Sequence, residues 1–338
     1  MGTAEDVPRL VSVPQAVTFA SVRSGPTANH TCASTSDGSS PGDLYCWGAN
    51  ESGQLGIGAS GAPVLEPKLV DEAAFSGVFA LGARHTCALT SGGASGRAWC
   101  WGDNSHGQLG NGTNAESSDP VQLSPWKLSS IAAGHSHTCA FAVGERAVLC
   151  WGRNDVFQLG LGGGDREERL EPTFIAGQGE FNLLEPRLGA HHSCALGAEG
   201  TKLFCWGQNG LGQLGDGSFV DRDIATRLLS DELSLRQMDM GGSHTCVLTS
   251  AGGAYCVGAN DSRQLGSGLS VDSTSILVPV SGGLSFDGPF AAGGRHTCGL
   301  DAKGDTYCWG SNDFGQLGDG SRALRPLPTF VVQGRPVP

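Results

Sequence analysis

The twelve cysteines of this 338-residue chain are the residues most capable of chemistry, and they alternate between two settings. One kind follows His-Thr or His-Ser, and the other precedes Trp-Gly or, once, Val-Gly. In chain order they form six pairs separated by 14, 13, 11, 11, 10 and 10 residues. The pairs are Cys32 with Cys46, Cys87 with Cys100, Cys139 with Cys150, Cys194 with Cys205, Cys246 with Cys256, and Cys298 with Cys308.

These pairs favour disulfides over a metal framework. Zinc knuckles need Cys-x2-Cys spacing, which occurs nowhere in the chain. The alternative is twelve buried thiols in a cytosolic protein, but burial alone does not account for pairwise recurrence. We therefore predict six short-loop disulfides and an extracellular, periplasmic or cell-surface location, with the signal segment not part of this sequence.

Six histidines recur with the cysteines: His30, His85, His137, His192, His244 and His296. With one in each unit they are too far apart to share an ion, so we expect buried imidazoles bonded to adjacent backbone. His106, His135 and His191 lie outside this pattern, on loops of consecutive units, and could meet. The spacing of these three histidines matches no metal-ligand motif, and we predict no metal site.

Catalytic patterns are missing from the sequence. It contains no nucleophile elbow, no phosphate-binding loop and no matched acid pair, so we predict neither an enzyme nor a cofactor. Asp216-Gly217 and Asp319-Gly320 resemble fragments of calcium loops, but Asp-Gly is an ordinary turn signal.

Composition narrows the class of protein further. The chain has 54 glycines, which indicates many tight turns, and 39% hydrophobic residues, which suffice for a core. With a net charge of −12, the protein lacks the basic surface that nucleic-acid binding needs. No apolar run is long enough to insert in a membrane. We therefore expect a partner that is another protein.

An internal repeat dominates the sequence. The first cysteines of the pairs are spaced by 55, 52, 55, 52 and 52 residues. In every copy the second cysteine is followed by one residue (Trp or, once, Val) and then by Gly-x-Asn. A Gln-Leu-Gly element follows a few residues later. In the third copy, residues 128–134, 137–141, 148–151 and 172–175 have the character of short strands. Four strands in about 50 residues predict a β-propeller. We expect six blades, with seven as the alternative, and one disulfide in each.

The predicted propeller spans residues 8–332, between tails at 1–7 and 333–338. Its units are expected at about 8–58, 67–112, 120–164, 172–217, 224–268 and 279–320, with a closing strand at 326–332. Pro8-Arg9-Leu10-Val11 and Pro328-Thr329-Phe330-Val331 both look like a fourth strand, so either end could close the ring.

The Gly-x-x-His-Thr, Trp-Gly-x-Asn and Gly-Gln-Leu-Gly elements resemble the regulator of chromosome condensation repeat family over nearly the whole chain. The resemblance implies a ring-shaped propeller, commonly of seven blades. Family members include an exchange factor for a small GTPase, a UV-B photoreceptor and a secreted β-lactamase-inhibitory propeller. Gly82-Ala83-Arg84-His85-Thr86 lacks the tryptophan of the photoreceptor motif, so the resemblance does not extend to light sensing.

Departures from the repeat predict where a partner binds. Before the glutamine most copies have glycine, whereas copy three has Phe157 and copy five has Arg263. One position earlier lie His106, Val156, Leu211 and Phe314. Aromatic and arginine side chains anchor protein interfaces, so we predict a binding face lined by these six residues. The run Asp165-Arg166-Glu167-Glu168 on the same face favours a partner with a basic patch.

The function that fits best is an exported or cell-surface interaction module, such as an adhesin, a receptor-like domain or an inhibitor. The alternative is an intracellular guanine-nucleotide exchange factor or scaffold for a small GTPase.

Overall fold

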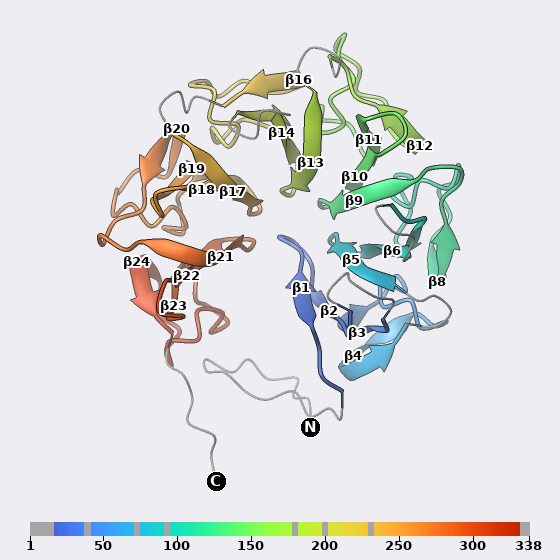
Figure 1. Cartoon of the computed structure of the whole chain (residues 1–338), viewed down its shortest axis with the longest axis horizontal. Helices are drawn as coiled ribbons and strands as arrows, with labels where there is room; N and C mark the ends of the chain where they lie inside the picture. Colours follow the sequence, from blue (N-terminus) through green and yellow to red (C-terminus); the bar gives the residue numbers. More distant parts are fainter. Residues whose placement is uncertain are drawn as a thin grey trace.

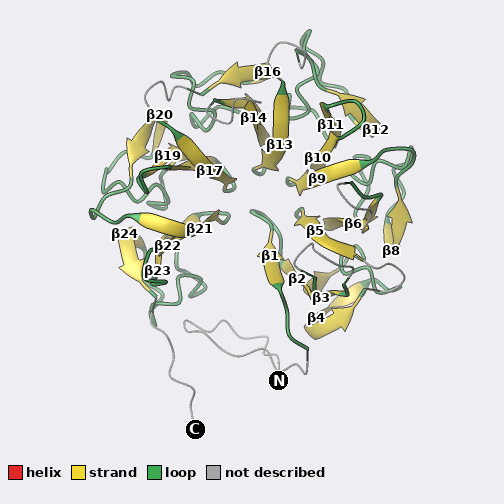
Figure 2. Ribbon diagram, in the orientation of Figure 1, coloured by secondary structure: helices red, strands yellow, loops and turns green. Residues whose placement is uncertain are grey.

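The structure is a ring of six four-stranded antiparallel sheets, the blades of a β-propeller (Figure 1). This computed structural model describes residues 17–36, 42–70, 75–90, 95–177, 182–197, 202–228 and 233–331. Strands and loops account for all of these residues, as Figure 2 shows. Within these ranges no helix could cross a membrane. The predicted all-β propeller with six blades is thereby confirmed.

Each blade is built from four consecutive strands, the first nearest the ring axis (Figure 1). Blade 1 contains β1 (Ser21–Ser24), β2 (His30–Ser34), β3 (Leu44–Asn50) and β4 (Gly61–Leu69). Blade 2 contains β5 (Phe75–Leu81), β6 (His85–Thr90), β7 (Ala98–Gly102) and β8 (Ser117–Gln122). Blade 3 contains β9 (Leu128–Ala133), β10 (His137–Ala142), β11 (Ala147–Gly152) and β12 (Arg169–Phe174).

The second half of the chain repeats this order. Blade 4 contains β13 (Leu183–Leu188), β14 (His192–Gly197), β15 (Leu203–Gly207) and β16 (Arg222–Arg227). Blade 5 contains β17 (Leu235–Met240), β18 (His244–Thr249), β19 (Ala254–Ala259) and β20 (Ser273–Pro279). Blade 6 contains β21 (Phe286–Ala292), β22 (His296–Asp301), β23 (Thr306–Gly310) and β24 (Arg325–Phe330). The segment around Pro328 is thus the outer strand of blade 6, whereas Pro8–Val11 and both tails lie outside the described residues.

A disulfide joins the two middle strands of every blade. The cysteines sit directly opposite each other in the register, as Cys139 and Cys150 do, with Cα atoms 4.1 Å apart. All six predicted pairs form, and no free cysteine is left. Opposed residues of an antiparallel pair are close enough for this bond, so sequence register alone determines the pairing.

Alternation along the middle strands gives each blade two different faces. The cysteines point to one face, the Cys face, and the tryptophan that follows the second cysteine points to the other, the Trp face. The Trp face of each of blades 2 to 6 packs on the Cys face of the blade before it: Trp101 of blade 2 joins Cys32, Cys46 and Leu55 of blade 1 in one buried cluster. Gly56 at φ +68° lies under the Trp101 indole, where a Cβ would approach to 2.6 Å, so this contact requires glycine.

A chain of buried hydrogen bonds crosses each interface between successive blades; we call it the relay. His85 Nε2 of blade 2 lies 2.9 Å from the Thr138 hydroxyl of blade 3. That hydroxyl donates to the carbonyl oxygen of Gln108 of blade 2 at 2.9 Å. The Trp151 indole N–H donates to the same oxygen at 2.9 Å.

The relay recurs at all five interfaces from blade 1 to blade 6. The histidine partners are Thr86, Thr138, Ser193, Thr245 and Thr297 in turn. Only the tryptophan bond is missing at the interface of blades 4 and 5, because Val257 replaces tryptophan. The expectation that each histidine bonds adjacent backbone was therefore wrong: the partner is a hydroxyl 53 to 56 residues away.

The relay fixes the protonation of its histidines. Because the threonine hydroxyl donates its single hydrogen to the carbonyl, it must accept from Nε2–H, which leaves Nδ1 without a proton. His85 Nδ1 is buried with no partner. Burial lowers the pKa of His85 to about 4 and that of His30, His192 and His244 to about 3, so these imidazoles are neutral.

No relay joins blade 6 to blade 1. Among the described residues, the hydroxyl of Thr31 and the indole of Trp47 in blade 1 have no hydrogen-bond partner, and neither has the His296 imidazole in blade 6. The described strands of blades 6 and 1 pack less closely than those of the other neighbours, although the turn at Gly294 of blade 6 lies close to the Pro26 carbonyl of blade 1. We call this interface the seam.

Thr138→Val tests the relay, with Thr31→Val as the matched control. Valine removes the hydroxyl but keeps the shape, so Thr138→Val leaves the buried Gln108 carbonyl and His85 Nε2 short of a partner. We expect it to lower the free energy of unfolding by about 1–3 kcal/mol. Thr31→Val should change it by less than about 0.5 kcal/mol. Urea unfolding with the disulfides intact measures both; equal effects would show that the relay contributes nothing to stability.

The neutral histidines predict acid-sensitive folding. Their folded pKa lies below the ordinary 6.5, so the unfolded chain takes up protons first as pH falls. Stability is therefore retained above pH 6.5 and lost toward pH 4, by about 1.4 kcal/mol per pH unit for each histidine. His85→Gln keeps an N–H donor for Thr138 but cannot titrate. It should reduce the proton uptake on unfolding by about one proton in this range; an unchanged uptake would contradict the assignment.

Candidate interaction face and hub channel

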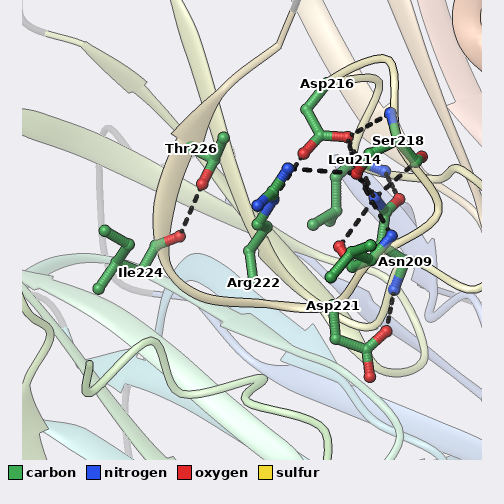
Figure 3. A network of polar contacts seen from close by, with 9 residues as sticks. Asn209, Leu214, Asp216, Ser218, Asp221, Arg222, Ile224 and Thr226 are labelled. Carbon is green, nitrogen blue, oxygen red and sulfur yellow. Dashed lines mark hydrogen bonds and ion pairs between the residues drawn. The ribbon is translucent and has the colours of Figure 1, made fainter. Parts of the chain in front are cut away.

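The loops between the third and fourth strands carry the recurring Gly-x-Asn and Gln-Leu-Gly elements, and their asparagine fixes the loop conformation. In blade 4, Asn209 Oδ1 accepts from the Leu214 N–H at 3.0 Å, and Asn209 Nδ2 donates to the carbonyls of Ser218 and Val220 at 3.1 Å. Figure 3 shows these bonds converging on one side chain. The equivalent asparagines in the other five blades accept from the equivalent leucine. The recurring asparagine therefore shapes the loop and is not free for a ligand.

Asp216, whose Asp-Gly sequence resembles a fragment of a calcium loop, already has hydrogen-bond partners within the same loop. Its carboxylate accepts from the Ser218 N–H at 2.9 Å and from Arg222 Nε at 2.6 Å (Figure 3). Burial opposes its ionisation, but the bonds from Ser218 and Arg222 outweigh burial and lower the pKa. Asp319 makes the same contacts with Ser321 and Arg325. Both aspartates are loop braces, and the described residues contain no group of three or more metal-ligating side chains.

The six residues predicted to contact a partner lie in five separate loops, one on each of blades 2 to 6. Leu211 and Phe314 are exposed, by 42% and 66%. Val156 is half-buried, and His106 places Nδ1 3.0 Å from the Glu168 carboxylate.

Phe157 and Arg263 occupy a backbone position that glycine fills elsewhere. Their φ angles are +65° and +60°, against +76° to +80° for the glycines of the other four loops. Such a conformation costs a side-chain-bearing residue about 1 kcal/mol. Phe157 lies under the Arg166 guanidinium at 3.9 Å, and Arg263 donates to the carbonyls of Asn260 and Val271 at 3.1 and 3.2 Å. Both side chains are half-buried and brace their own loops.

The acidic run of blade 3 is largely paired within the protein. Asp165 bonds Arg169, Glu168 bonds His106, and Arg166 reaches the Asp155 carbonyl. The Asp165–Arg169 ion pair and the contact of Glu168 with His106 reduce the charge that the run offers to a basic partner.

Two of the three non-repeating histidines do meet. The rings of His135 and His191 lie 5.3 Å apart, in the turns that join first and second strands of blades 3 and 4. Burial lowers the pKa of His191 to about 4, and the nearby His135 and Arg153 add to the effect. His106 bonds Glu168 instead. The two imidazoles are half-buried, and the pKa of each lies below the ordinary 6.5, so both are neutral near pH 7.

The innermost strands enclose a channel on the ring axis with a cavity of about 490 Å³. Six equivalent positions line it, each paired in register with the first cysteine of its blade. They are occupied by Arg23, Ala80, Ala132, Arg187, Asp239 and Ala291. The sequence reasoning missed this charged set. Lining up the residue two places before the Gly-x-x-His turn in blades 2 to 6 would have revealed Arg187 and Asp239 among alanines.

Asp239 is the unusual member of this set. Burial raises its pKa to about 6, although its Oδ2 accepts the Ala292 N–H of blade 6 at 2.8 Å. Neither arginine forms an ion pair with it among the described residues: Arg23 donates to the Phe79 carbonyl at 3.3 Å, and Arg187 to that of Pro186 at 3.2 Å. The channel thus carries two arginines and one weakly acidic carboxyl in an otherwise acidic protein.

Fold and site define a disulfide-bonded β-propeller made of one repeated unit. A model of the regulator of chromosome condensation (RCC1) repeat matches residues 41–89, 95–141, 147–196 and 202–248. A second RCC1 repeat model matches residues 27–54, 79–108, 236–264 and 290–316. The chain belongs to the RCC1 repeat family.

Two curated relatives show the range of proteins that contain this repeat. The chain is 34% identical to the ultraviolet-B receptor UVR8 of Arabidopsis thaliana over 221 residues, 63% of this chain and 48% of the receptor. It is 28% identical to the human E3 ubiquitin-protein ligase HERC2 over 304 residues, 86% of this chain and 6% of the ligase. The chain thus spans about half of the first and a small part of the second.

Solved structures agree on the fold. Human WBSCR16 superposes with a TM-score of 0.82 at 23% identity, covering 96% of this chain and 85% of that one. Yeast RCC1 (Prp20), solved bound to Kap60, gives 0.78 at 21% identity, covering 93% of this chain and 75% of that one.

Asp239→Asn tests the environment of the channel. The folded pKa of Asp239 is raised above its ordinary 3.8, so the stability it contributes is present below pH 3.8 and lost as pH rises through about 6. Asparagine keeps an acceptor for Ala292 without the charge. We expect the variant to be more stable than the parent by about 1–3 kcal/mol above pH 7, and equal to it near pH 3.8.

Urea midpoints across this pH range provide the measurement. Asp287→Asn, at an exposed aspartate of β21 that pairs with Arg236, is the control, because an exposed ion pair contributes little to stability. A variant less stable than the parent above pH 7 would mean that the channel arginines need the Asp239 charge.

Proposed function

We propose that this chain is an exported or cell-surface propeller that binds another protein through its loop-lined face. The observation that carries the proposal is the exposure of apolar side chains at the tips of loops that are otherwise braced internally. Blade 4 presents Leu211, Phe219 and Val220, exposed by 42%, 52% and 61%. Blade 6 presents Phe314, exposed by 66%. Large apolar side chains on a rigid frame bind with little loss of conformational entropy.

The proposal extends to three other loops: His106 and Val156 lie at the position equivalent to Leu211 and Phe314, and Phe157 and Arg263 lie one position later. A face of this kind reaches one partner at several points around the ring. The RCC1-repeat structure solved with Kap60 and the curated relatives support an interaction role in general terms. An intracellular exchange factor for a small GTPase has only the shared fold in its favour.

The proposed location of the protein in an oxidising compartment can be tested separately. Twelve cysteines within bonding reach of their partners support folding in an oxidising compartment. Protein purified without reductant and denatured in a thiol reagent should show no free thiol. Twelve reactive thiols in such a preparation would exclude export and favour the intracellular alternative.

Photo-crosslinking tests the binding face. A photoreactive phenylalanine analogue at Phe314 should capture a protein from the extracellular fraction of the source cells. The same analogue at Lys303, in the β22–β23 turn of the same blade, should not, because that turn lies at the opposite end of the strands. Excess unlabelled chain should compete with capture, whereas the Leu211→Ser/Phe314→Ser double variant should compete poorly.

Both positions are exposed, so the double variant should melt within about 2 °C of the parent. Capture at position 303 in place of 314, or equal competition by the double variant, would show that the loop-lined face is not the binding surface.

A further inference from the structure

The channel on the ring axis concentrates positive charge in a protein whose net charge is −12. Its cavity of about 490 Å³ lies among the first strands of the six blades, which surround the axis in Figure 1. Arg23 of β1 and Arg187 of β13 line this cavity, and Asp239 of β17 is the one carboxyl among the described residues of its wall. The cavity therefore carries a net positive charge at neutral pH.

Short side chains leave the axis open. At the six equivalent positions of the wall, three blades carry alanine: Ala80 in blade 2, Ala132 in blade 3 and Ala291 in blade 6. Methyl groups at half of these positions leave a space that the two arginines and the aspartate do not fill. The volume of this space lies in the range of small-molecule sites in proteins.

Both guanidinium groups are held in place and still have donors to spare. Arg23 Nη1 donates to the Phe79 carbonyl at 3.3 Å, and the Arg23 Cζ lies 5.2 Å from the centre of the Phe79 ring. Arg187 Nη1 donates to the Pro186 carbonyl at 3.2 Å. A guanidinium carries five N–H groups, and neither arginine has a further hydrogen-bond partner among the described residues. The remaining N–H groups are available to a ligand in the cavity.

The two arginines act on each other through the cavity. Burial lowers the pKa of Arg23, and the positive charge of Arg187 lowers it further, whereas Asp239 raises it. Asp239 forms no ion pair with either arginine, because its Oδ2 accepts the Ala292 N–H of blade 6 at 2.8 Å. An anion that bonds both guanidinium groups would relieve the repulsion between them.

We propose that the hub channel binds a small oxyanion, a carboxylate or a phosphate-type group, between Arg23 and Arg187. The planar fork of a guanidinium matches two oxygens of a carboxylate or of a tetrahedral oxyanion. Two guanidinium groups on opposite halves of the chain favour a dianion over a monoanion, because each can take its own pair of oxygens. This site lies on the ring axis and goes beyond the loop-lined face of the proposed function.

Asp239 makes the binding of this anion depend on pH. The charged groups that act on its carboxyl are Arg187 of β13 and Arg23 of β1, which favour ionisation, while burial raises its pKa to about 6. The stretches of β5 and β9 in the wall are apolar, and β21 contributes the Ala292 N–H. A bound anion opposes ionisation of Asp239, so protonation and binding strengthen each other. The affinity should fall as pH rises through about 6.

Equilibrium dialysis of the intact protein against radiolabelled sulfate at constant ionic strength tests the site, because sulfate remains a dianion throughout this pH range. We expect one sulfate per chain, bound several-fold more weakly at about pH 7.5 than at about pH 5. Arg23→Gln and Arg187→Gln should each weaken binding about tenfold, the effect of one lost hydrogen bond to a charged group. The control is Arg236→Gln, at an exposed arginine of β17 that pairs with Asp287, and it should bind as the parent does.

Asp239→Asn isolates the role of the carboxyl. Asparagine resembles the protonated acid, so the variant should bind sulfate at about pH 7.5 as tightly as the parent does at about pH 5. Competition at about pH 7.5 then distinguishes two sources of the oxyanion. Stronger competition by malonate assigns the site to a dicarboxylate, and stronger competition by inorganic phosphate assigns it to a phosphate group.

Sulfate binding that is absent, or equal in the parent and both channel arginine variants, would overturn the proposal. So would an equal loss of binding in Arg236→Gln, which would show that sulfate responds to overall charge and not to the channel. Urea unfolding in chloride checks that each variant is folded. The loop-lined face plays no part in these readouts, so sulfate binding can fail while protein capture at Phe314 succeeds.

Discussion

The structure depends on one buried contact, repeated from blade to blade: an imidazole N–H held by a hydroxyl that is itself held by a backbone carbonyl. Packing of tryptophan on disulfide contributes to the buried apolar surface between blades, but apolar packing is tolerant of small rotations. The relay does not tolerate such rotations, because its atoms are buried and each lost hydrogen bond leaves an unpaired polar group. The relay therefore sets the angle between neighbouring blades, and through that angle it sets the curvature of the ring.

Much of this architecture could be predicted from sequence because its determinants are local. The disulfide pairing of Cys139 with Cys150 follows from two strands joined by a short turn, and the burial of Trp151 follows from alternation along one of them. The partner of His85 could not be predicted in this way. Thr138 lies 53 residues further on, and nothing in the His-Thr dipeptide tells whether its two side chains serve the same interface or different ones.

The channel and the seam were hidden for a different reason. Arg23, Arg187 and Asp239 come from blades 1, 4 and 5 and share an environment only because the ring closes around one axis. Thr31 and His296 have the same sequence neighbours as their buried counterparts, so a repeat pattern assigns them the same role. Only the curvature accumulated over six blades separates them. A property of the whole ring, and not of any unit, decides what these residues contact.

The placement of the disulfides has a mechanical consequence. Every bridge closes a hairpin inside one blade, and none links two blades. The blades are thus stiff, covalently closed plates, while each joint between plates consists of hydrogen bonds, apolar contact and a single connecting segment. Under tension or crowding such a ring deforms by hinging at its joints while the plates keep their shape. We expect the joint between blades 6 and 1, which no relay spans among the described residues, to be the most compliant of the six.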